Sequence, residues 1–375
     1  MKITDVEAIV VRNTAVDPTI ADGSQDDLVV RVSTDEGIVG VGEVDSSPEV
    51  ARAVIEAPAS HSLACGLREL LLGADPLAVE ECWERMYRRA IFLGRRGVAI
   101  HAMSGVDIAL WDIKGQALGQ PVAALLGTPV RSRVRAYASM LMPESPAEVR
   151  SRVAEARDAG FTAVKLGWGP LGTDPARDVE LAAAACDAGG SNTAIMIDAG
   201  FAYGEDAALA ASVARELHEL GVYWLEEPLD PDALGPYAAL TAASDLRIAA
   251  GEQEATRWSF GDLVERGCVD VVQPDVSRCG GITELVRIAE LAREHGVATV
   301  PHAWKSGIVK AASLHVDAIL PGDGVFLEYC VADSPITRDL TRETFPLDDD
   351  GFVAVPTGPG LGVTLDDEVV ERYRV

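Results

Sequence analysis

A repeat of strands and helices in the second part of the chain restricts the fold more than any other feature. Short apolar runs alternate there with segments of helical periodicity. The runs lie at residues 134–140, 162–167, 193–198, 222–226, 247–252, 269–274, 297–301 and 325–329. Near-continuous apolar strands separated by helices are typical of parallel sheets covered by helices. Eight such units favour a closed (β/α)8 barrel over an open doubly wound sheet.

Ionisable residues follow seven of these runs, each at or just after the end of a run. They are Lys165, Asp198, Glu226, Glu252, Asp275, His302 and Glu328. The spacing between them is about one strand–helix unit. The carboxyl ends of barrel strands meet at one mouth, where the active sites of this fold lie. We therefore expect the seven side chains to form one cluster.

The first part of the chain has a different pattern. Residues 3–12, 27–33 and 37–43 read as an antiparallel meander, and a helix with regular apolar spacing is expected within residues 95–118. The tail from residue 341 no longer follows the repeat. The sequence therefore predicts an α/β protein: a (β/α)8-type (modified TIM) barrel over residues 126–340. An α+β capping domain would be formed by residues 1–125 and by the tail, residues 341–375, which returns to it.

Composition excludes several classes of function. The formal net charge of −27 argues against binding of nucleic acid, whose phosphates would be repelled. The chain has no signal-peptide pattern and no run of about 18 apolar residues, so we expect a cytoplasmic protein outside the membrane. The six cysteines never form C-x-x-C and are expected to be free thiols.

Asp198, Glu226 and Glu252 end three consecutive runs and form the candidate metal site. Carboxylate oxygens are the ligands that Mg²⁺ prefers, with water and substrate completing the octahedron. Crowded acids would repel one another unless a cation lay among them. Glu227 adjoins Glu226, and because side chains alternate along a strand only one of the two can face the barrel axis. The sequence leaves that choice open.

His302 is the histidine that directly ends a run, and Asp275 ends the run before it. A carboxylate that accepts the imidazole N–H orients a histidine base and raises its basicity. We therefore expect His302 and Asp275 to act together as a general base. The other histidines, at positions 61, 101, 218, 295 and 315, are predicted to be structural.

Lysine is scarce in this chain, which has five lysines against 27 arginines, so Lys165 at the end of a run is a candidate catalytic residue. The alternative is a buried stem with a solvated head. The G-x-G-x-x-G pattern that begins at Gly167 is typical of dinucleotide sites only where a helix opens at once. Here Pro170 and Pro175 postpone the helix to about residue 178, which disfavours nucleotide binding.

At this point the motifs, taken in order along the chain, resemble those of the enolase superfamily, in its mandelate racemase-like branch. The motifs are Gly105-Val-Asp-Ile-Ala-Leu-Trp-Asp-Ile-Lys-Gly115, Met196-Ile-Asp-Ala-Gly200, Trp224-Leu-Glu-Glu-Pro-Leu229, Ala250-Gly-Glu-Gln253, the stretch from Gln273 to Thr283 and Val300-Pro-His-Ala-Trp304. The resemblance covers nearly the whole chain. It implies a barrel with a capping domain and a carboxylate substrate.

The resemblance also implies roles for the clustered residues. Asp198, Glu226 and Glu252 would bind Mg²⁺, and His302 paired with Asp275 would be the general base. Glu328 would hydrogen-bond an oxygen of the substrate carboxylate. Lys165 would assist that carboxylate electrostatically.

One departure from the family pattern bears on the reaction. Racemases of this branch carry Lys-x-Lys at the end of the second strand, and the second lysine is the base on the opposite face. Here Lys165 is followed by Leu166 and Gly167, so one face has no base. A second departure is Gly200, where an asparagine is common. We therefore predict an Mg²⁺-dependent dehydratase of an acid sugar, a carbon–oxygen lyase that forms a 2-keto-3-deoxy acid.

Two other functions stay open on the sequence. The first is a racemase, epimerase or cycloisomerase that acts on a carboxylate substrate with the same barrel. The second is a barrel that keeps the metal site and binds a ligand or partner without catalysis. Mono-acid and di-acid sugars are both candidate substrates. By resemblance, we expect a symmetric homo-oligomer.

Substrate contacts are expected from two segments that would close over the barrel mouth. They are the loop of residues 13–26 and the arginine-rich stretch of residues 88–96, from which Arg89 is a candidate contact. Trp304 is a candidate pocket wall.

Overall fold

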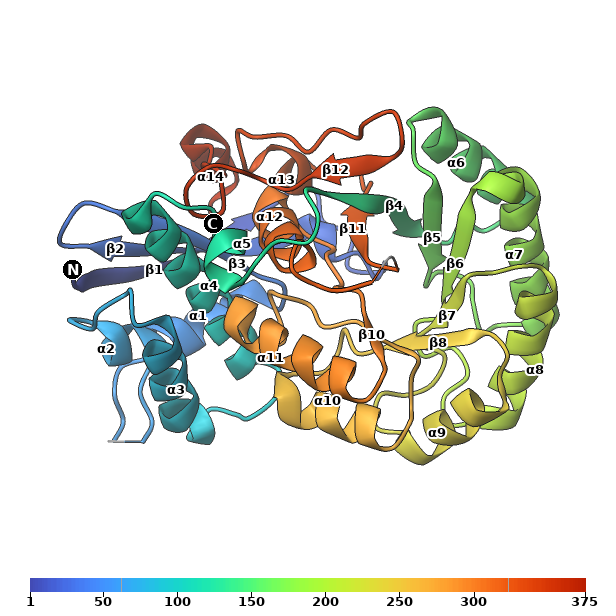
Figure 1. Ribbon diagram of the computed structural model, residues 1–375, viewed down its shortest axis with the longest axis horizontal. Helices are drawn as coiled ribbons and strands as arrows, with labels where there is room; N and C mark the ends of the chain where they lie inside the picture. Colours follow the sequence, from blue (N-terminus) through green and yellow to red (C-terminus); the bar gives the residue numbers. More distant parts are fainter. Residues whose placement is uncertain (62, 323) are drawn as a thin grey trace.

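The computed structural model describes residues 1–61, 63–322 and 324–375. An antiparallel sheet with its helices lies at one end of the molecule, and a curled parallel sheet surrounded by helices lies at the other (Figure 1).

The capping lobe is built on a three-stranded antiparallel sheet in the order β1-β2-β3. Its elements are β1 (Ile3–Arg12), η1 (Gly23–Gln25), β2 (Asp26–Thr34), β3 (Val39–Val44), α1 (Pro48–Glu56), α2 (Leu67–Leu71), α3 (Val79–Arg89), η2 (Ala90–Phe92), α4 (Val98–Leu118) and α5 (Val122–Leu126). The three predicted strands are therefore confirmed. The long predicted helix is α4.

Helix α4 joins the two lobes. A Cβ at Gly42 would lie 1.9 Å from the carbonyl oxygen of Gly105, so only glycine lets α4 approach β3 this closely. Most residues of α4 are buried on every side, as expected for a helix enclosed by other elements. On the barrel side, the indole N–H of Trp111 donates to the hydroxyl of Thr283 at 2.8 Å.

Each of the eight predicted runs contains a strand, and the strands pair in parallel in the order β10-β9-β8-β7-β6-β5-β4-β11. They are β4 (Arg133–Leu141), β5 (Ala163–Gly167), β6 (Ala194–Asp198), β7 (Trp224–Glu226), β8 (Arg247–Ala250), β9 (Val271–Val272), β10 (Ala298–Thr299) and β11 (Phe326–Cys330). Across the two ends of this path, the backbone N–H of Ala303 donates to Glu328 at 2.8 Å. The predicted barrel architecture is confirmed.

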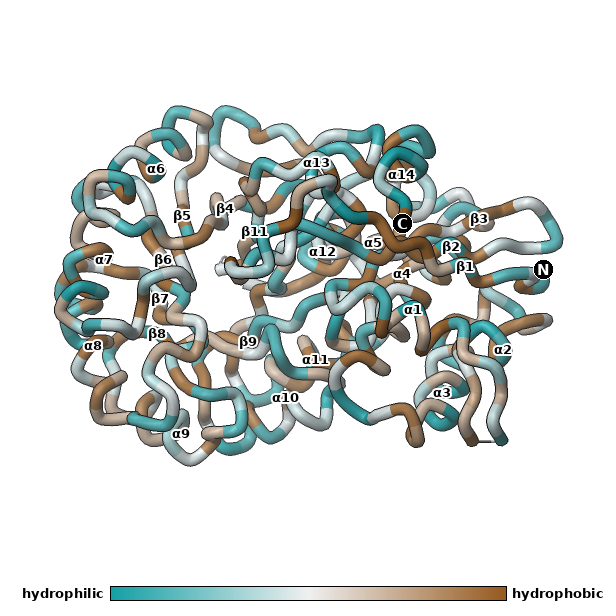
Figure 2. Tube along the Cα trace, turned by 180° about the vertical axis from the view of Figure 1, so that it is seen from behind, coloured by the Kyte–Doolittle hydropathy of each residue, from teal (hydrophilic) through white to brown (hydrophobic). Residues whose placement is uncertain are grey.

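Helices wrap the outer side of the barrel (Figure 1). They are α6 (Pro146–Asp158), α7 (Pro175–Gly189), η3 (Gly190–Asn192), α8 (Ala207–Glu219), α9 (Leu234–Ala243), α10 (Thr256–Glu265), α11 (Gly281–Glu294) and α12 (Gly307–Asp317). Helix α13 (Pro335–Asp339) lies beside α12 and contacts η1 of the capping lobe. The tubes of α7 and α8 alternate between apolar and polar residues, as in helices with one buried face (Figure 2). Helix α7 begins at Pro175, capped by the Asp174 carboxylate, so a loop separates it from Gly167. Among the described residues, no helix is long and apolar enough to cross a membrane.

One layer of eight side chains fills the barrel below its mouth. Each strand contributes one of them, with Val300 directly after β10. They are Tyr137, Ala163, Met196, Trp224, Ala249, Val271, Val300 and Phe326. Aromatic rings interlock edge to face, as in the Tyr137–Trp224 pair with ring centroids 5.9 Å apart. The barrel is therefore a packed core with a solid floor under the mouth.

The C-terminal tail contacts both lobes. Strand β12 (Phe352–Ala354) pairs antiparallel with β4 on the barrel. Helix α14 (Asp367–Tyr373) lies near β1, and the following Arg374 forms an ion pair with Glu7 at 2.7 Å. The domain boundaries at residues 125 and 340 stay predictions.

His315 connects the tail to α12 and the capping lobe. Its Nδ1 accepts from the N–H of Ala123 at 3.2 Å, so Nε2 carries the proton and donates to the carbonyl of Leu361 at 3.1 Å. Burial lowers the pKa of His315 to about 4. Between pH 4 and the unfolded-state pKa of about 6.5, the unfolded chain binds the extra proton. His315 therefore stabilises the fold above that window, and this contribution is lost as the pH falls through it.

We expect His315→Gln to remove this pH-dependent contribution, because glutamine can accept and donate the same two bonds and does not titrate. Lowering the pKa of His315 from its ordinary value of about 6.5 to about 4 corresponds to roughly 3 kcal/mol of unfolding free energy. Urea unfolding of both proteins at pH 7 and pH 4 measures it. The loss of stability on acidification should be smaller in the variant by about that amount. An equal loss in both proteins would contradict the assignment.

Candidate active site

The candidate residues rise directly from the barrel floor. Side chains two positions apart on a strand share a face, so the residue two positions after each floor residue points into the mouth. These residues are Ser139, Lys165, Asp198, Glu226, Gln273, His302 and Glu328. On β8 the corresponding position is Gly251, with φ of 129°, and Glu252 comes one residue later. Sequence reasoning missed Ser139 and Gln273, although this offset of two residues could have identified both.

The mouth holds a cavity of about 180 Å³ between the barrel and the capping lobe. Five of the seven predicted residues line it: Lys165, Asp198, Glu252, His302 and Glu328. Glu226 and Asp275 lie behind this surface, in contact with Lys165 and His302 respectively. The predicted wall residue Trp304 also lines the cavity. The structure thus brings together all seven residues of the predicted cluster.

Asp198, Glu226 and Glu252 are close enough to share a cation. One carboxylate oxygen of each lies within 4.8 Å of the others, and all three side chains are buried. Burial, and then the charge of Glu226, raises the pKa of Asp198 well above its ordinary value. Three buried carboxylates repel one another unless positive charge lies between them. A set of donors that are all oxygen atoms suits a hard divalent cation. These residues therefore fit Mg²⁺.

The structure decides between Glu226 and Glu227. The Glu226 carboxylate accepts from Lys165 Nζ at 2.5 Å and from the Trp224 indole N–H at 2.9 Å, on the side of the barrel axis. Glu227, with φ of 43°, turns away from it and accepts the backbone N–H of Gly251 at 2.8 Å. Glu226 is therefore the member of the pair in the carboxylate cluster.

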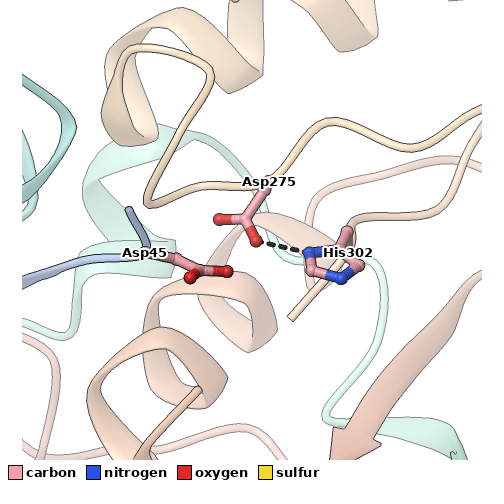
Figure 3. A group of neighbouring side chains, drawn as sticks. All are labelled: Asp45, Asp275 and His302. Carbon is pink, nitrogen blue, oxygen red and sulfur yellow. Dashed lines mark hydrogen bonds and ion pairs between the residues drawn. The ribbon is translucent and has the colours of Figure 1, made fainter. Parts of the chain in front are cut away.

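His302 and Asp275 form the expected pair (Figure 3). His302 Nδ1 lies 2.5 Å from one oxygen of Asp275, whose other oxygen accepts from the N–H and hydroxyl of Ser277. In this hydrogen bond we place the proton on Nδ1, which donates it to Asp275. This leaves Nε2 to face the other carboxylates, 3.1 Å from Glu252 and 3.7 Å from Glu328.

The charges around His302 set its protonation. Burial alone would lower the pKa of His302. The nearby carboxylates of Glu252, Glu328 and Asp275 outweigh burial and raise the pKa to about 10. Positive charge placed among the carboxylates would weaken this effect and bring the imidazole closer to its neutral, basic form.

Glu328 is held as an anion. Its oxygens accept from the Ser139 hydroxyl at 2.6 Å, Lys165 Nζ at 2.9 Å and the N–H of Ala303 at 2.8 Å. Burial would raise its pKa, but the charges of Lys165 and His302 and these bonds lower it to about 2. An ionised Glu328 accepts hydrogen bonds and holds Lys165 in place.

Gly167 lacks a basic side chain, and neighbouring atoms also occupy the space that such a side chain would need. Strands β5 and β6 pair Gly167 with Asp198, and a Cβ at Gly167 would lie 2.5 Å from the Cβ of Asp198. A Cβ at Gly200 would similarly lie 2.7 Å from the indole of Trp168, which lines the cavity. Asp198 and Trp168 therefore take the space in which side chains at these two positions would begin.

Strained backbone follows four consecutive barrel strands. Positive φ values occur at Trp168, Phe201, Glu227 and Thr256, after β5, β6, β7 and β8 respectively. Such conformations cost about 1–3 kcal/mol each and cluster at functional sites. Their position at the mouth supports its assignment as the active site.

The loop of residues 13–26 closes one side of the cavity, as expected. Ala21 and Gly23 line the cavity. The Trp304 indole N–H donates to Asp22 at 3.2 Å. The buried Lys305 ammonium donates to the carbonyls of Gly23 at 2.5 Å and Asp26 at 2.7 Å. Lys305 therefore fastens this loop to the barrel.

Asp45, which follows β3, brings a capping-lobe carboxylate beside the His302–Asp275 pair (Figure 3). It forms a close ion pair with Arg278 and lies 3.4 Å from Lys305. Arg278 and Lys305 each come three residues after a predicted catalytic residue, so they lie in the turns after those strand ends. Sequence reasoning missed this network because Asp45 comes from the other lobe.

We expect Lys305→Met to loosen the loop of residues 13–26, because Ala21 and Gly23 would no longer be held at the cavity. KM should rise at least about tenfold, with a smaller change in kcat. Losing one partner of buried ion pairs should also cost about 3–5 kcal/mol of stability. Hydrogen exchange of residues 20–26, with steady-state kinetics, measures the effect. The control is Lys310→Met, another buried lysine, which lies over the Tyr329 ring. Unchanged exchange in the Lys305 variant would contradict this role.

The arginine-rich stretch of residues 88–96 contributes no described residue to the lining of the cavity at the barrel mouth. Arg89 is exposed at the end of α3 and is not among the described residues that line the cavity. Arg95 and Arg96 line a separate groove with Tyr87 and Trp258. The contact predicted for Arg89 stays a prediction.

Both lobes of the chain match families of known proteins. Residues 7–127 match the Mandelate racemase / muconate lactonizing enzyme N-terminal domain family, and residues 148–369 match the Enolase C-terminal domain-like family. The chain is 36% identical to a D-galactonate dehydratase of Verminephrobacter eiseniae, over 92% of this chain and 91% of that protein. It is 33% identical to a D-galactarolactone cycloisomerase of Agrobacterium fabrum, over 93% and 91%.

Among solved structures, the 3,6-anhydro-D-galactonate cycloisomerase of Zobellia galactanivorans superposes with a TM-score of 0.90 at 30% identity and covers 100% of both chains. Both lobes of this chain thus match known families, and its fold agrees with that structure over the full length. The chain belongs to the enolase superfamily, in the branch of mandelate racemase and muconate lactonizing enzyme.

Proposed function

We propose that this protein is an Mg²⁺-dependent dehydratase of an acid sugar. One observation carries the proposal. A carboxylate cluster, a histidine–aspartate pair and a buried lysine meet at one cavity, and the base lies on one face of that cavity. The similarity to a D-galactonate dehydratase supports an acid sugar as the substrate.

Asp198, Glu226 and Glu252 would hold the Mg²⁺ ion. When bound, the ion supplies positive charge that stabilises the anion formed on proton removal and makes His302 less strongly protonated. Lys165 adds a fixed positive charge beside the cluster, held by Glu226 and Glu328. Charge that is already in place before the reaction is usually the largest catalytic contribution.

His302 performs the proton transfers. Its Nε2 takes the proton from the carbon next to the substrate carboxylate, and the electron pair of that C–H bond enters the enediolate. Asp275 stabilises the imidazolium that forms, through the bond to Nδ1. The imidazolium then returns the proton to the β-hydroxyl as its C–O bond breaks, and water leaves. The enol product tautomerises to a 2-keto-3-deoxy acid.

A single base restricts the stereochemistry. Both transfers use Nε2, so the proton and the hydroxyl leave from the same side of the substrate. Side-chain space at Gly167, the position of the second base in racemases, is taken by Asp198. This arrangement supports syn elimination over racemisation, which needs a proton donor and an acceptor on opposite faces.

Cycloisomerisation is the second candidate, because two of the similar proteins are cycloisomerases. The first step would be the same. If the β-oxygen belongs to a ring of the substrate, its departure opens the ring and no water is lost. The same residues would then catalyse an isomerisation.

The test is a screen of acid sugars and their lactone and anhydro forms with the Mg²⁺-loaded protein, followed by mass spectrometry and an assay for 2-keto acids. A 2-keto acid lighter than its substrate by one water is the expected product. A product of unchanged mass from a cyclic substrate would favour the cycloisomerase. A stereoisomer of the substrate would overturn both in favour of a racemase or epimerase.

A further inference from the structure

The lysine and the arginine that line the cavity are already paired with carboxylates. Lys165 and Arg278 are the lysine and arginine among its described lining residues. Lys165 Nζ lies 2.5 Å from Glu226 and 2.9 Å from Glu328. Arg278 forms a close ion pair with Asp45, whose pKa is lowered accordingly although burial opposes the shift.

The Arg278–Asp45 pair does not depend on the carboxylate cluster. Arg278 Nη1 also lies 3.5 Å from Glu252, but that distance is long for a hydrogen bond. If Glu252 turned toward a cation, Asp45 would still neutralise Arg278. The charge of Arg278 is therefore committed within the protein.

Apart from the reacting end, which holds Asp198, Glu252, Glu328 and His302, the remaining cavity wall offers neutral contacts. Trp168, Trp304, Met140 and Leu141 supply apolar surface for the carbon chain of a sugar, and the Gln253 amide can bond hydroxyl groups. The Trp304 N–H is already donated to Asp22, which adds a negative charge at this side of the mouth.

We propose that the substrate carries one carboxylate only, as in an aldonic acid or a mono-anionic lactone or anhydro sugar, and that sugar di-acids are rejected by charge. This inference rests on the proposed function. One carboxylate binds at the reacting end, beside Lys165 and the carboxylate cluster that fits Mg²⁺. A second carboxylate would lose its water against neutral groups, and the negative charge of Asp22 lies nearby. Burying an ion without a partner is strongly unfavourable.

The first experiment compares matched sugars with the Mg²⁺-loaded protein. Each aldonate is paired with the di-acid of the same configuration, and kcat/KM is measured for both. We expect at least about a 100-fold preference for the mono-acid, because sites discriminate strongly when a buried polar group is left unpaired. Equal or higher kcat/KM for a di-acid would overturn the proposal.

The second experiment adds a cation to the wall. Leu141→Lys places an ammonium at the end of β4 without changing a catalytic residue, and Leu141→Gln is the neutral control. Both variants lose the apolar contact of Leu141, so the measured quantity is the ratio of kcat/KM for the di-acid to kcat/KM for the mono-acid. We expect this ratio to be at least about tenfold higher in the lysine variant than in the glutamine variant. If both variants behave alike, exclusion by charge is contradicted and shape decides the selection. Thermal unfolding of each variant checks that it is folded.

The two proposals fail in different ways. If no acid sugar is dehydrated or isomerised, the proposed function is wrong. Calorimetric binding of the same pairs in the presence of Mg²⁺ then tests the charge inference by itself. Binding of mono-acids over di-acids supports it, and equal binding contradicts it.

Discussion

Replacing His302 with asparagine is expected to lower kcat by about 10⁴-fold, the upper end of what a positioned acid–base group contributes. His302 performs both proton transfers in the proposed reaction, and Gly167 leaves no side chain to replace it from the opposite face. Asparagine can still donate to Asp275, so the fold should be kept. Turnover of the acid-sugar substrate measures the effect.

Exchange of the α-proton in deuterated water separates base loss from a later defect. In substrate recovered before turnover is complete, the wild-type enzyme should have replaced the α-proton by deuterium, and the His302→Asn variant should not. His295→Asn is the matched control, because His295 is exposed at the end of α11 and should behave like wild type. Continued exchange in the His302 variant would reveal a second base and restore the racemase interpretation.

Replacing Asp198 with asparagine is expected to have opposite effects on the metal-free and the metal-loaded protein. Burial raises the pKa of Asp198 well above normal, so its ionised form destabilises the metal-free fold at neutral pH. For an acid of raised pKa, this penalty appears as the pH rises above the unfolded-state value. Neutral asparagine removes the penalty, and the metal-free variant should melt a few degrees above wild type.

The response to Mg²⁺ should move the other way. A ligand that binds only the folded state at 100 times its Kd adds about 2.7 kcal/mol of stability. Wild type should gain this stabilisation, and the Asp198→Asn variant should lose most of it along with turnover. Scanning calorimetry with EDTA and with increasing Mg²⁺ measures both effects.

Glu227→Gln is the matched control for the metal experiment. Glu227 is also buried, with a raised pKa, but it bonds the N–H of Gly251 instead of joining the carboxylate cluster. Its variant should gain metal-free stability and keep the full response to Mg²⁺. A full Mg²⁺ response in the Asp198 variant would show that Asp198 is not a ligand.

Much of the candidate site could be predicted because strand geometry is local. Apolar runs of about one strand length predicted all eight barrel strands, and the ends of those runs identified Lys165, Asp198 and His302 as neighbours. The same rule could have found Ser139, which follows the floor residue Tyr137 by two positions. Ser139 was not predicted, because a serine within an apolar run does not by itself indicate a function. Its role becomes visible once the structure places Glu328 beside it.

Other features depend on contacts between distant parts of the chain. The choice of Glu226 over Glu227 follows from the backbone turn after β7, which the alternation of side chains left open. The ion pair of Asp45 with Arg278 depends on how the capping lobe sits on the barrel. That pairing leaves Arg278 without a free charge for the substrate, and no sequence pattern reports it.

The sequence by itself thus determined the barrel, the capping domain and the set of residues that meet at the mouth, because the period of two along a strand and the repeat of about one strand–helix unit are properties of local backbone geometry. The missing base at Gly167 was also visible in it. Only the tertiary structure decided that Asp198 takes the side-chain space at Gly167, that Lys305 fastens the loop over the cavity and that the lysine and arginine of the cavity are already paired. Those properties arise from packing and charge between residues that the chain brings together only when it folds.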